Sequence, residues 1–109
     1  MRAVSVSMGA NGTLDVALRG EIDFTNAAEV REIIRTAVAG ERPAAVRADL
    51  ADVTFVDSSG IGVLVSAMKA AEETGATYRV EHPNVKVHHQ LRVAGLLDAF
   101  GLAEPPSED

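Results

Sequence analysis

The run Asp57-Ser58-Ser59-Gly60 is the place in this sequence where residue types and spacing could support chemistry on a side chain. It follows an apolar stretch and precedes apolar residues at helical spacing, so it falls where a strand gives way to a helix. Functional groups in α/β sheets gather at the carboxyl ends of strands, beside unpaired N–H groups of helix N-termini. We therefore expect Ser58 to be exposed. A phosphoryl group there would add about −1.5 to −2 charges beside Asp57 without unfolding the helix.

The same run also fits an ordinary helix cap. Asp and Ser directly before an apolar helix accept hydrogen bonds from its first N–H groups, and such caps are common. The residues alone favour that structural role over a phosphorylation site. A phosphorylated Ser58 therefore needs an argument beyond the local pattern.

The elements that must position Ser58 alternate between the periods of strands and helices. Alternating apolar residues around Asn11-Gly12 predict an N-terminal hairpin. The apolar pattern then predicts a helix over residues 25–39, a strand over 45–50 with apolar character extending to Val56, and a helix over 59–74. After these it predicts a strand over 77–81 and a third helix with Pro83 in its first turn. A short terminal helix is expected to contain Leu96, Leu97 and Phe100.

The ends and faces of these helices give further expectations. Asp23 or Thr25 can cap the first helix, and Gly40 followed by Pro43 can end it. In the third helix, the expected buried side chains are Val87, Leu91 and Ala94, with Gly95 as the C-terminal cap.

This order of elements predicts a single α/β domain. We expect a mixed sheet of four to five strands, with an N-terminal hairpin and helices joined by right-handed crossovers. The domain should span residues 1–102, and residues 103–109 read as a disordered acidic tail.

Composition narrows the possible functions. The chain has 109 residues and no cysteine, so disulfides and thiolate metal sites are excluded. Its formal net charge of −6 argues against nucleic acid and anionic membranes as partners. No long apolar run at the start suggests a signal peptide or membrane span, so we expect a soluble, cytoplasmic protein.

Three patterns that suggest enzymes are set aside. Gly60-Ile61-Gly62 lacks the third glycine and acidic partner of a dinucleotide fingerprint, and more plausibly makes room for close helix packing. The three histidines, His82, His88 and His89, have spacing better suited to a surface than to a metal site. A Gly-x-Ser-x-Gly elbow is missing. We expect no catalytic residues, no metal, no cofactor and no enzyme activity.

Three segments together carry a resemblance to a known family. They are residues 49–64, the stretch Gly20-Glu21-Ile22-Asp23 with Thr25 and Ala27, and Val93-Ala94-Gly95-Leu96 with Phe100. The first resembles the central motif of STAS domains, and the others resemble the family's segment before the first helix and its C-terminal part. The resemblance covers nearly the whole chain except the tail. Asp-Ser-Ser-Gly in a free-standing domain of this length is similar to the anti-sigma factor antagonists of this family.

The resemblance implies a partner-switching cycle. The unphosphorylated protein would bind an anti-sigma factor that is also a serine kinase, and so release the sigma factor. Phosphorylation of Ser58, the serine directly after the aspartate, would end binding, and a metal-dependent serine phosphatase would restore it. Asp57, Ser59 and Gly60 would shape the partner-binding surface with Ser58. Asp23 would line it by analogy, although a capping role fits it equally well.

Two other classes of function stay open at this stage. A STAS scaffold subunit of a stress-sensing or lipid-transport assembly would form stable oligomers, whereas an antagonist should be a monomer or weak dimer. A small nucleotide-binding or hydrolytic protein would bind ATP or GTP in isolation.

Overall fold

A computed structural model describes residues 2–103 of the chain. Within these residues, the sheet has four strands in the order β1-β2-β3-β4. The hairpin strands β1 (Val4–Met8) and β2 (Thr13–Ile22) pair antiparallel, as predicted. β3 (Ala45–Val56) and β4 (Thr77–Glu81) continue the sheet with parallel pairing. The predicted α/β class and mixed sheet are confirmed.

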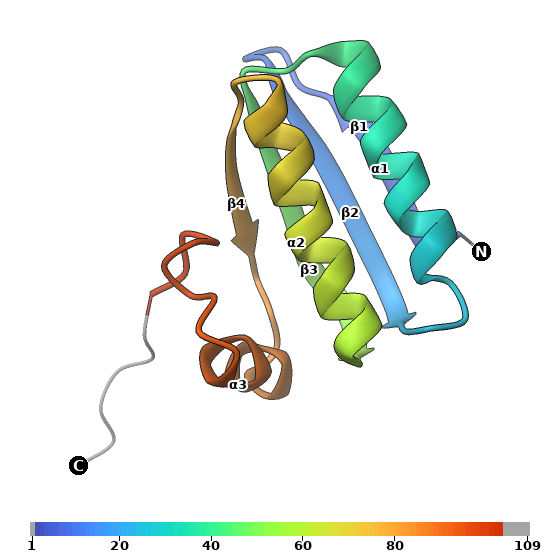
Figure 1. The fold of residues 1–109 in the computed structure, drawn as a ribbon, viewed down its shortest axis with the longest axis vertical. Helices are drawn as coiled ribbons and strands as arrows, with labels where there is room; N and C mark the ends of the chain where they lie inside the picture. The colour runs from blue at the N-terminus through green and yellow to red at the C-terminus, as the bar shows by residue number, and fades with distance from the viewer. Residues whose placement is uncertain (1, 104–109) are drawn as a thin grey trace.

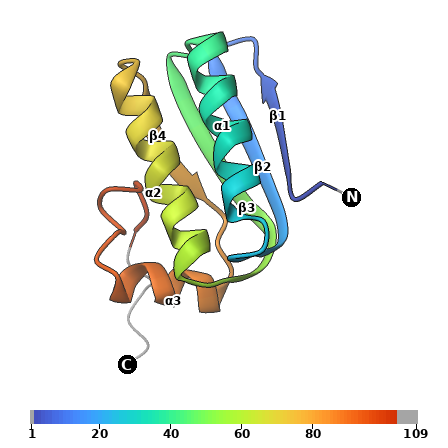
Figure 2. The same cartoon turned by 45° about the vertical axis from the view of Figure 1, so that its right-hand side comes forward.

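In the described part of the chain, three helices complete the fold, and two of them share one face of the sheet. α1 (Ala27–Glu41) packs over β1 and β2, while α2 (Ser58–Glu73) packs over β3 and β4 and against α1 (Figures 1 and 2). α3 (Val85–Val93) lies apart from this pair, at the end of the molecule where α2 begins (Figure 1). The apolar side chains of each strand and helix that face this layer are therefore out of water.

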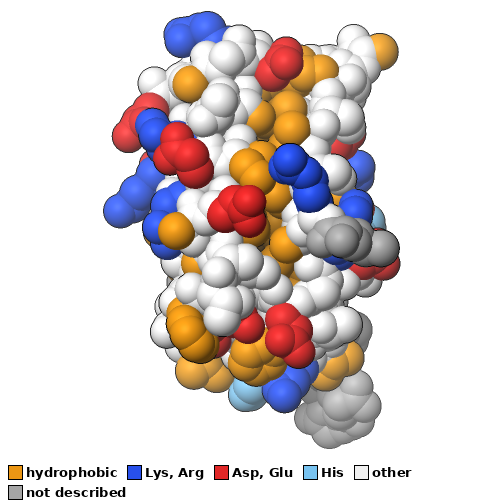
Figure 3. Space-filling view, turned by 90° about the vertical axis from the view of Figure 1, so that its right-hand side faces the viewer, with side chains coloured by type: hydrophobic (Ala, Val, Ile, Leu, Met, Phe, Trp, Pro, Cys, Tyr) orange, Lys and Arg blue, Asp and Glu red, His pale blue; other side chains and the backbone are white. Residues whose placement is uncertain are grey.

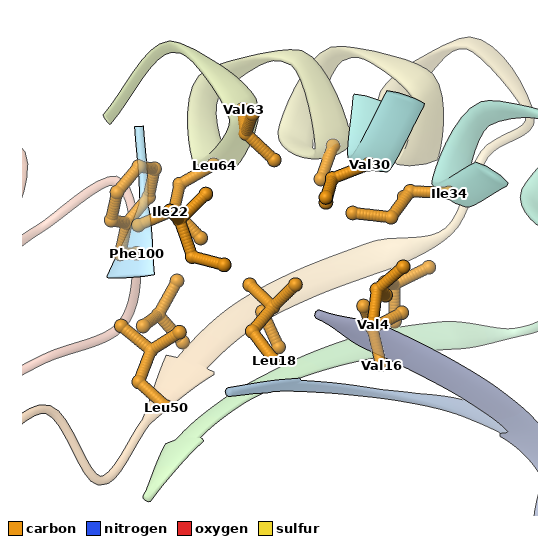
Figure 4. Packing of buried hydrophobic residues seen from close by; sticks show 14 of the residues in the cluster. Val4, Val16, Leu18, Ile22, Val30, Ile34, Leu50, Val63, Leu64 and Phe100 are labelled. Carbon is orange, nitrogen blue, oxygen red and sulfur yellow. The ribbon is translucent and has the colours of Figure 1, made fainter. Parts of the chain in front are cut away.

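The core lies between this sheet face and the two helices (Figure 4). Alternate residues of β2 are buried there, which is the period of a strand with one covered face. The helices contribute side chains at intervals of three and four. Fully buried members include Val16, Leu18 and Ile22 from β2, Val30 and Ile34 from α1, Val63 and Leu64 from α2, and Phe100 near the C-terminus. Burial of apolar surface on this scale is the main force that holds the strand ends and helix starts in place.

Charged side chains occupy the opposite face of the sheet. Arg47 on β3 donates to Asp15 on β2 at 2.7 Å and to Glu81 on β4 at 2.9 Å. Arg79 also pairs with Glu81, and both arginines hold the pKa of that carboxyl below its ordinary value. Partly exposed pairs of this kind contribute little stability. The two faces of the sheet thus have different roles, and the covered one determines the fold.

Two predicted helix ends were wrong. Gly40 lies inside α1, which continues to Glu41 and ends with Arg42 in the left-handed conformation at φ 47°. One glycine costs a helix about 1 kcal/mol relative to alanine, too little to end it while Val38 is buried beside it. Pro83 precedes α3, because the Asn84 side chain caps that helix by accepting from the Val87 N–H at 2.8 Å.

The C-terminal part also differs from the prediction. Residues 97–101 form turns in place of a short helix, and Ala94 is exposed. Leu97 and Phe100 are nevertheless buried, and the Phe100 ring meets Tyr78 edge-on with 5.7 Å between ring centroids. The chain folds back directly onto β4, so turns are enough to bury these two side chains and no helix is needed. Of the predicted tail, residues 104–109 lie outside the described part of the chain.

Candidate functional site

Two strand ends bring the predicted site residues together. β2 and β3 run parallel as neighbours, and Ile22, the last residue of β2, is opposite Val56, the last residue of β3. The Asp57 N–H donates to the Ile22 carbonyl at 3.4 Å. The loop after β2 and the start of α2 therefore meet at one edge of the sheet (Figure 1).

Asp57 connects these two segments through its carboxylate. One oxygen, Oδ1, accepts from the Gly60 N–H at 3.0 Å and caps α2. The other, Oδ2, accepts from the Phe24 N–H at 3.1 Å, in the loop that leads to α1. The capping role expected of this residue is confirmed. The bond to Phe24 was missed, because the sequence separation of 33 residues gives no local signal of it.

Gly60 is buried where α2 starts against the end of β2. A Cβ atom at this position would lie 2.2 Å from the Ile22 carbonyl oxygen and 3.0 Å from the Val56 Cβ, closer than such atoms approach. Only glycine allows this helix start to touch the strand end. The expected close packing is thus present at Gly60. At Gly62 it is not, because an added Cβ would meet nothing within 4 Å. The burial of Gly60 indicates a packing role at this helix start.

Ser58 is the first residue of α2 and is exposed. The helix has no acidic residue in its first turn, and its first N–H groups create a partial positive charge there. Ser59, one residue further, is half-buried. The two adjacent serines therefore differ in exposure, and Ser58 is the more exposed of them.

Asp23 organises the loop between β2 and α1. Its Oδ1 accepts from the Thr25 N–H at 3.0 Å and from the Thr25 hydroxyl at 2.6 Å. These bonds hold the pKa of the Asp23 carboxyl below its ordinary value. The N-cap of α1 is Asn26, and its side chain does not cap the helix. The prediction that Asp23 or Thr25 caps α1 was wrong, because each side chain is engaged within the loop.

Asn26 closes the same loop from the other end. Its side-chain oxygen accepts from the Asp23 N–H at 3.0 Å, and its Nδ2 donates to the Glu21 carbonyl at 2.9 Å. The loop is thus built by its own side chains and attached to α2 through Asp57. It presents the Phe24 side chain to solvent with 78% of its surface exposed. Phe24 did not enter the sequence prediction, although an aromatic residue among polar loop residues is a usable signal.

Metal sites and membrane-spanning helices have requirements that the described residues do not meet. His82 lies 3.1 Å from an Asp49 carboxylate oxygen, and His88 contacts the Ala103 carbonyl at 2.9 Å. Within residues 2–103, no group of three or more His, Asp or Glu side chains could hold a metal ion. In the same part of the chain, no helix is both long and apolar enough to cross a membrane.

The family to which this architecture belongs is identified by comparison with known proteins. The model of the STAS domain family matches residues 7–108. The chain therefore belongs to the STAS domain family, as the motif at residues 49–64 indicated.

The similar proteins include several that are named as anti-sigma factor antagonists. An anti-sigma-B factor antagonist of Bacillus subtilis is 29% identical over 83% of this chain and 81% of its own length. An anti-sigma F factor antagonist of Paenibacillus polymyxa is 32% identical over 78% of this chain and 73% of its own. Among solved structures, the unphosphorylated anti-sigma factor antagonist SpoIIAA shares the fold with a TM-score of 0.78 at 23% identity, over 97% of this chain and 90% of that one.

Proposed function

We propose that this chain is an anti-sigma factor antagonist controlled by phosphorylation of Ser58. Its unphosphorylated form binds an anti-sigma factor that is also a serine kinase, and the sigma factor is released. The observation that carries the proposal is the exposed Ser58 at the first position of α2, directly after the capping Asp57. The antagonist names of the relatives support the same function.

The local geometry supplies a physical basis for the switch. Phosphorylation replaces a neutral hydroxyl by a group with about −1.5 to −2 charges. The N-terminus of α2 tolerates this charge, so the domain stays folded. Across an interface, the added charge and bulk meet a partner surface that was complementary to a hydroxyl beside Asp57. The kinase complex then dissociates while the fold is unchanged.

The remaining site residues have distinct parts in this proposal. Ser59 and Asp57 border the acceptor, and Asp23 fixes the neighbouring loop. Gly60 sets the position of the helix start. The proposed cycle takes place in the cytoplasm, includes a metal-dependent serine phosphatase and uses a monomer or weak dimer. It assigns no catalytic step to this chain.

The proposal is tested by direct phosphorylation. The protein is incubated with candidate anti-sigma factor kinases and ATP, and added phosphate is located by mass spectrometry. Ser58→Ala is the loss variant, and Ser59→Ala is the matched control at the adjacent hydroxyl. Phosphate on Ser58 in wild type and Ser59→Ala, but absent from Ser58→Ala, is the expected result. Phosphate on Ser59 alone, or on neither serine with every kinase tried, would refute the proposal.

A further inference from the structure

Large apolar side chains are exposed unevenly over the molecule. Within residues 2–103, six of them reach solvent: Val6 and Met8 on β1, Phe24 in the loop before α1, Phe55 near the end of β3, and Val85 and Val93 on α3. The last four belong to the end of the sheet that carries Ser58. Figure 3 shows hydrophobic side chains in a stripe along this face and in a group at the lower end of the molecule, where a histidine and a basic side chain lie beside them. Isolated exposed apolar residues are ordinary, whereas a group at one end marks an interaction surface.

The two aromatic residues of this group, Phe24 and Phe55, belong to the two segments that meet at Asp57. Phe24 is bonded to Asp57 through its N–H, and Phe55 lies two positions before Asp57. The chain has three phenylalanines, and only Phe100 is buried. Phe24 is the more exposed of the other two, at 78% against 36% for Phe55. Two exposed phenylalanines thus lie in the two segments that meet at Asp57, next to Ser58.

The backbone of Phe24 is held by hydrogen bonds, although its side chain is exposed to solvent. Three side chains, Asp23, Asn26 and Asp57, make hydrogen bonds to backbone N–H groups of this short loop. A ring presented on a fixed backbone loses little conformational freedom when a partner binds it. Exposed aromatic residues with this property are the usual energetic anchors of protein interfaces.

Phe55 is also held in place. The Lys86 ammonium group lies 5.8 Å from the centre of its ring, within the range of a cation–π contact. Two side chains attach α3 to the same strand end, because Asn84 donates to the Val53 carbonyl at 3.2 Å and Gln90 to the Val56 carbonyl at 3.0 Å. The ring of Phe55 therefore belongs to a surface shared by β3 and α3.

We infer that Phe24 and Phe55 are the apolar anchors with which the chain holds the kinase that phosphorylates Ser58, and that the kinase offers apolar pockets for both rings. The inference rests on the proposed function. It divides the interface into two parts: the rings supply affinity, and Ser58 controls whether that affinity can be used. Phe24 is the stronger anchor, since it has more surface left to bury.

The test measures equilibrium affinity by calorimetry, using the unphosphorylated chain and the kinase found to modify Ser58. Phe24→Ala should weaken binding by about tenfold or more, and Phe55→Ala by a smaller factor. Met8→Ala is the matched control, because Met8 is an exposed apolar residue at the opposite end of the sheet, beside Leu14 at the start of β2. Thermal unfolding of each variant shows whether the fold is intact.

The outcomes separate the inference from the function on which it rests. In one outcome, the kinase modifies Ser58 of wild type while Phe24→Ala and Phe55→Ala bind it with affinities within twofold of that of Met8→Ala. That result would refute the role of the two phenylalanines and would leave the proposed phosphorylation switch unaffected. An equal loss of kinase affinity in Met8→Ala and Phe24→Ala would also refute the role of the two phenylalanines. Failure of every kinase to modify wild type refutes the proposed function, and the inference falls with it.

Discussion

Two junctions at one edge of the sheet carry a strand into a helix, and they do so differently. Between β2 and α1 the chain uses four loop residues, 23–26, which bond to one another and to Glu21. Between β3 and α2 it uses Asp57 alone, whose side chain caps the helix. The long junction presents an aromatic side chain, and the short one presents a serine on a fixed helix start.

In the proposed function, the two junctions have separate roles, one in binding and one in control. A loop has room to expose a large apolar group such as Phe24, which would be hard to present from the crowded start of α2. A one-residue junction leaves Ser58 no freedom to move away from its helix. The Asp57 carboxylate accepts one hydrogen bond from the Phe24 N–H of the long junction and one from the Gly60 N–H of α2, so the two junctions are fixed relative to each other.

The largest effect should come from removing the close contact at the short junction. Gly60→Ala places a methyl group 2.2 Å from a backbone oxygen, so α2 must shift, and we expect a loss of about 3 kcal/mol in the free energy of unfolding. Gly62→Ala is the matched control in the same helix, where the space is open and helix propensity should add about 0.5–1 kcal/mol. Urea unfolding measures both. Equal effects would mean that the contact with β2 does not fix the start of α2.

Asp57 should have the next largest effect, because it serves both junctions. Asp57→Ala removes the cap and the bond to Phe24, and we expect a loss of about 2 kcal/mol in the free energy of unfolding. Asp57→Asn retains one acceptor oxygen and should lose about half as much. Amide hydrogen exchange at Phe24 should quicken in Asp57→Ala. Protection of that amide equal to wild type would contradict a bridge between the junctions.

The smallest effect concerns the long junction and depends on pH. The Thr25 hydroxyl holds the pKa of Asp23 below its ordinary value of 3.8. The folded-state pKa is thus lower than the unfolded one. The stability that Asp23 contributes is therefore complete above the unfolded value and is lost as the pH falls through the folded one. Urea unfolding of wild type and Asp23→Asn should differ at pH 6, and the difference should disappear as the pH falls below the folded-state pKa of Asp23. A difference that stays constant with pH would show that the carboxylate charge has no part in the loop.

The sequence was a good guide to the short junction and a poor one to the long junction. The boundary between β3 and α2 follows from a change of apolar period, which is local and strong, and Asp57 is a favoured cap. The long junction depends on contacts such as the bond from Phe24 to Asp57, which join residues far apart in sequence. Gly40 misled the prediction because the burial of Val38 outweighs a weak local preference.

The most direct test of the account is the affinity of the Ser58-directed kinase for three forms of the chain: wild type, Ser58→Ala and Ser58→Asp. Ser58→Ala should bind as tightly as unphosphorylated wild type and stay bound when ATP is added. Ser58→Asp should bind at least about tenfold more weakly. Equal affinity of Ser58→Ala and Ser58→Asp would contradict the claim that charge at the start of α2 controls the partner.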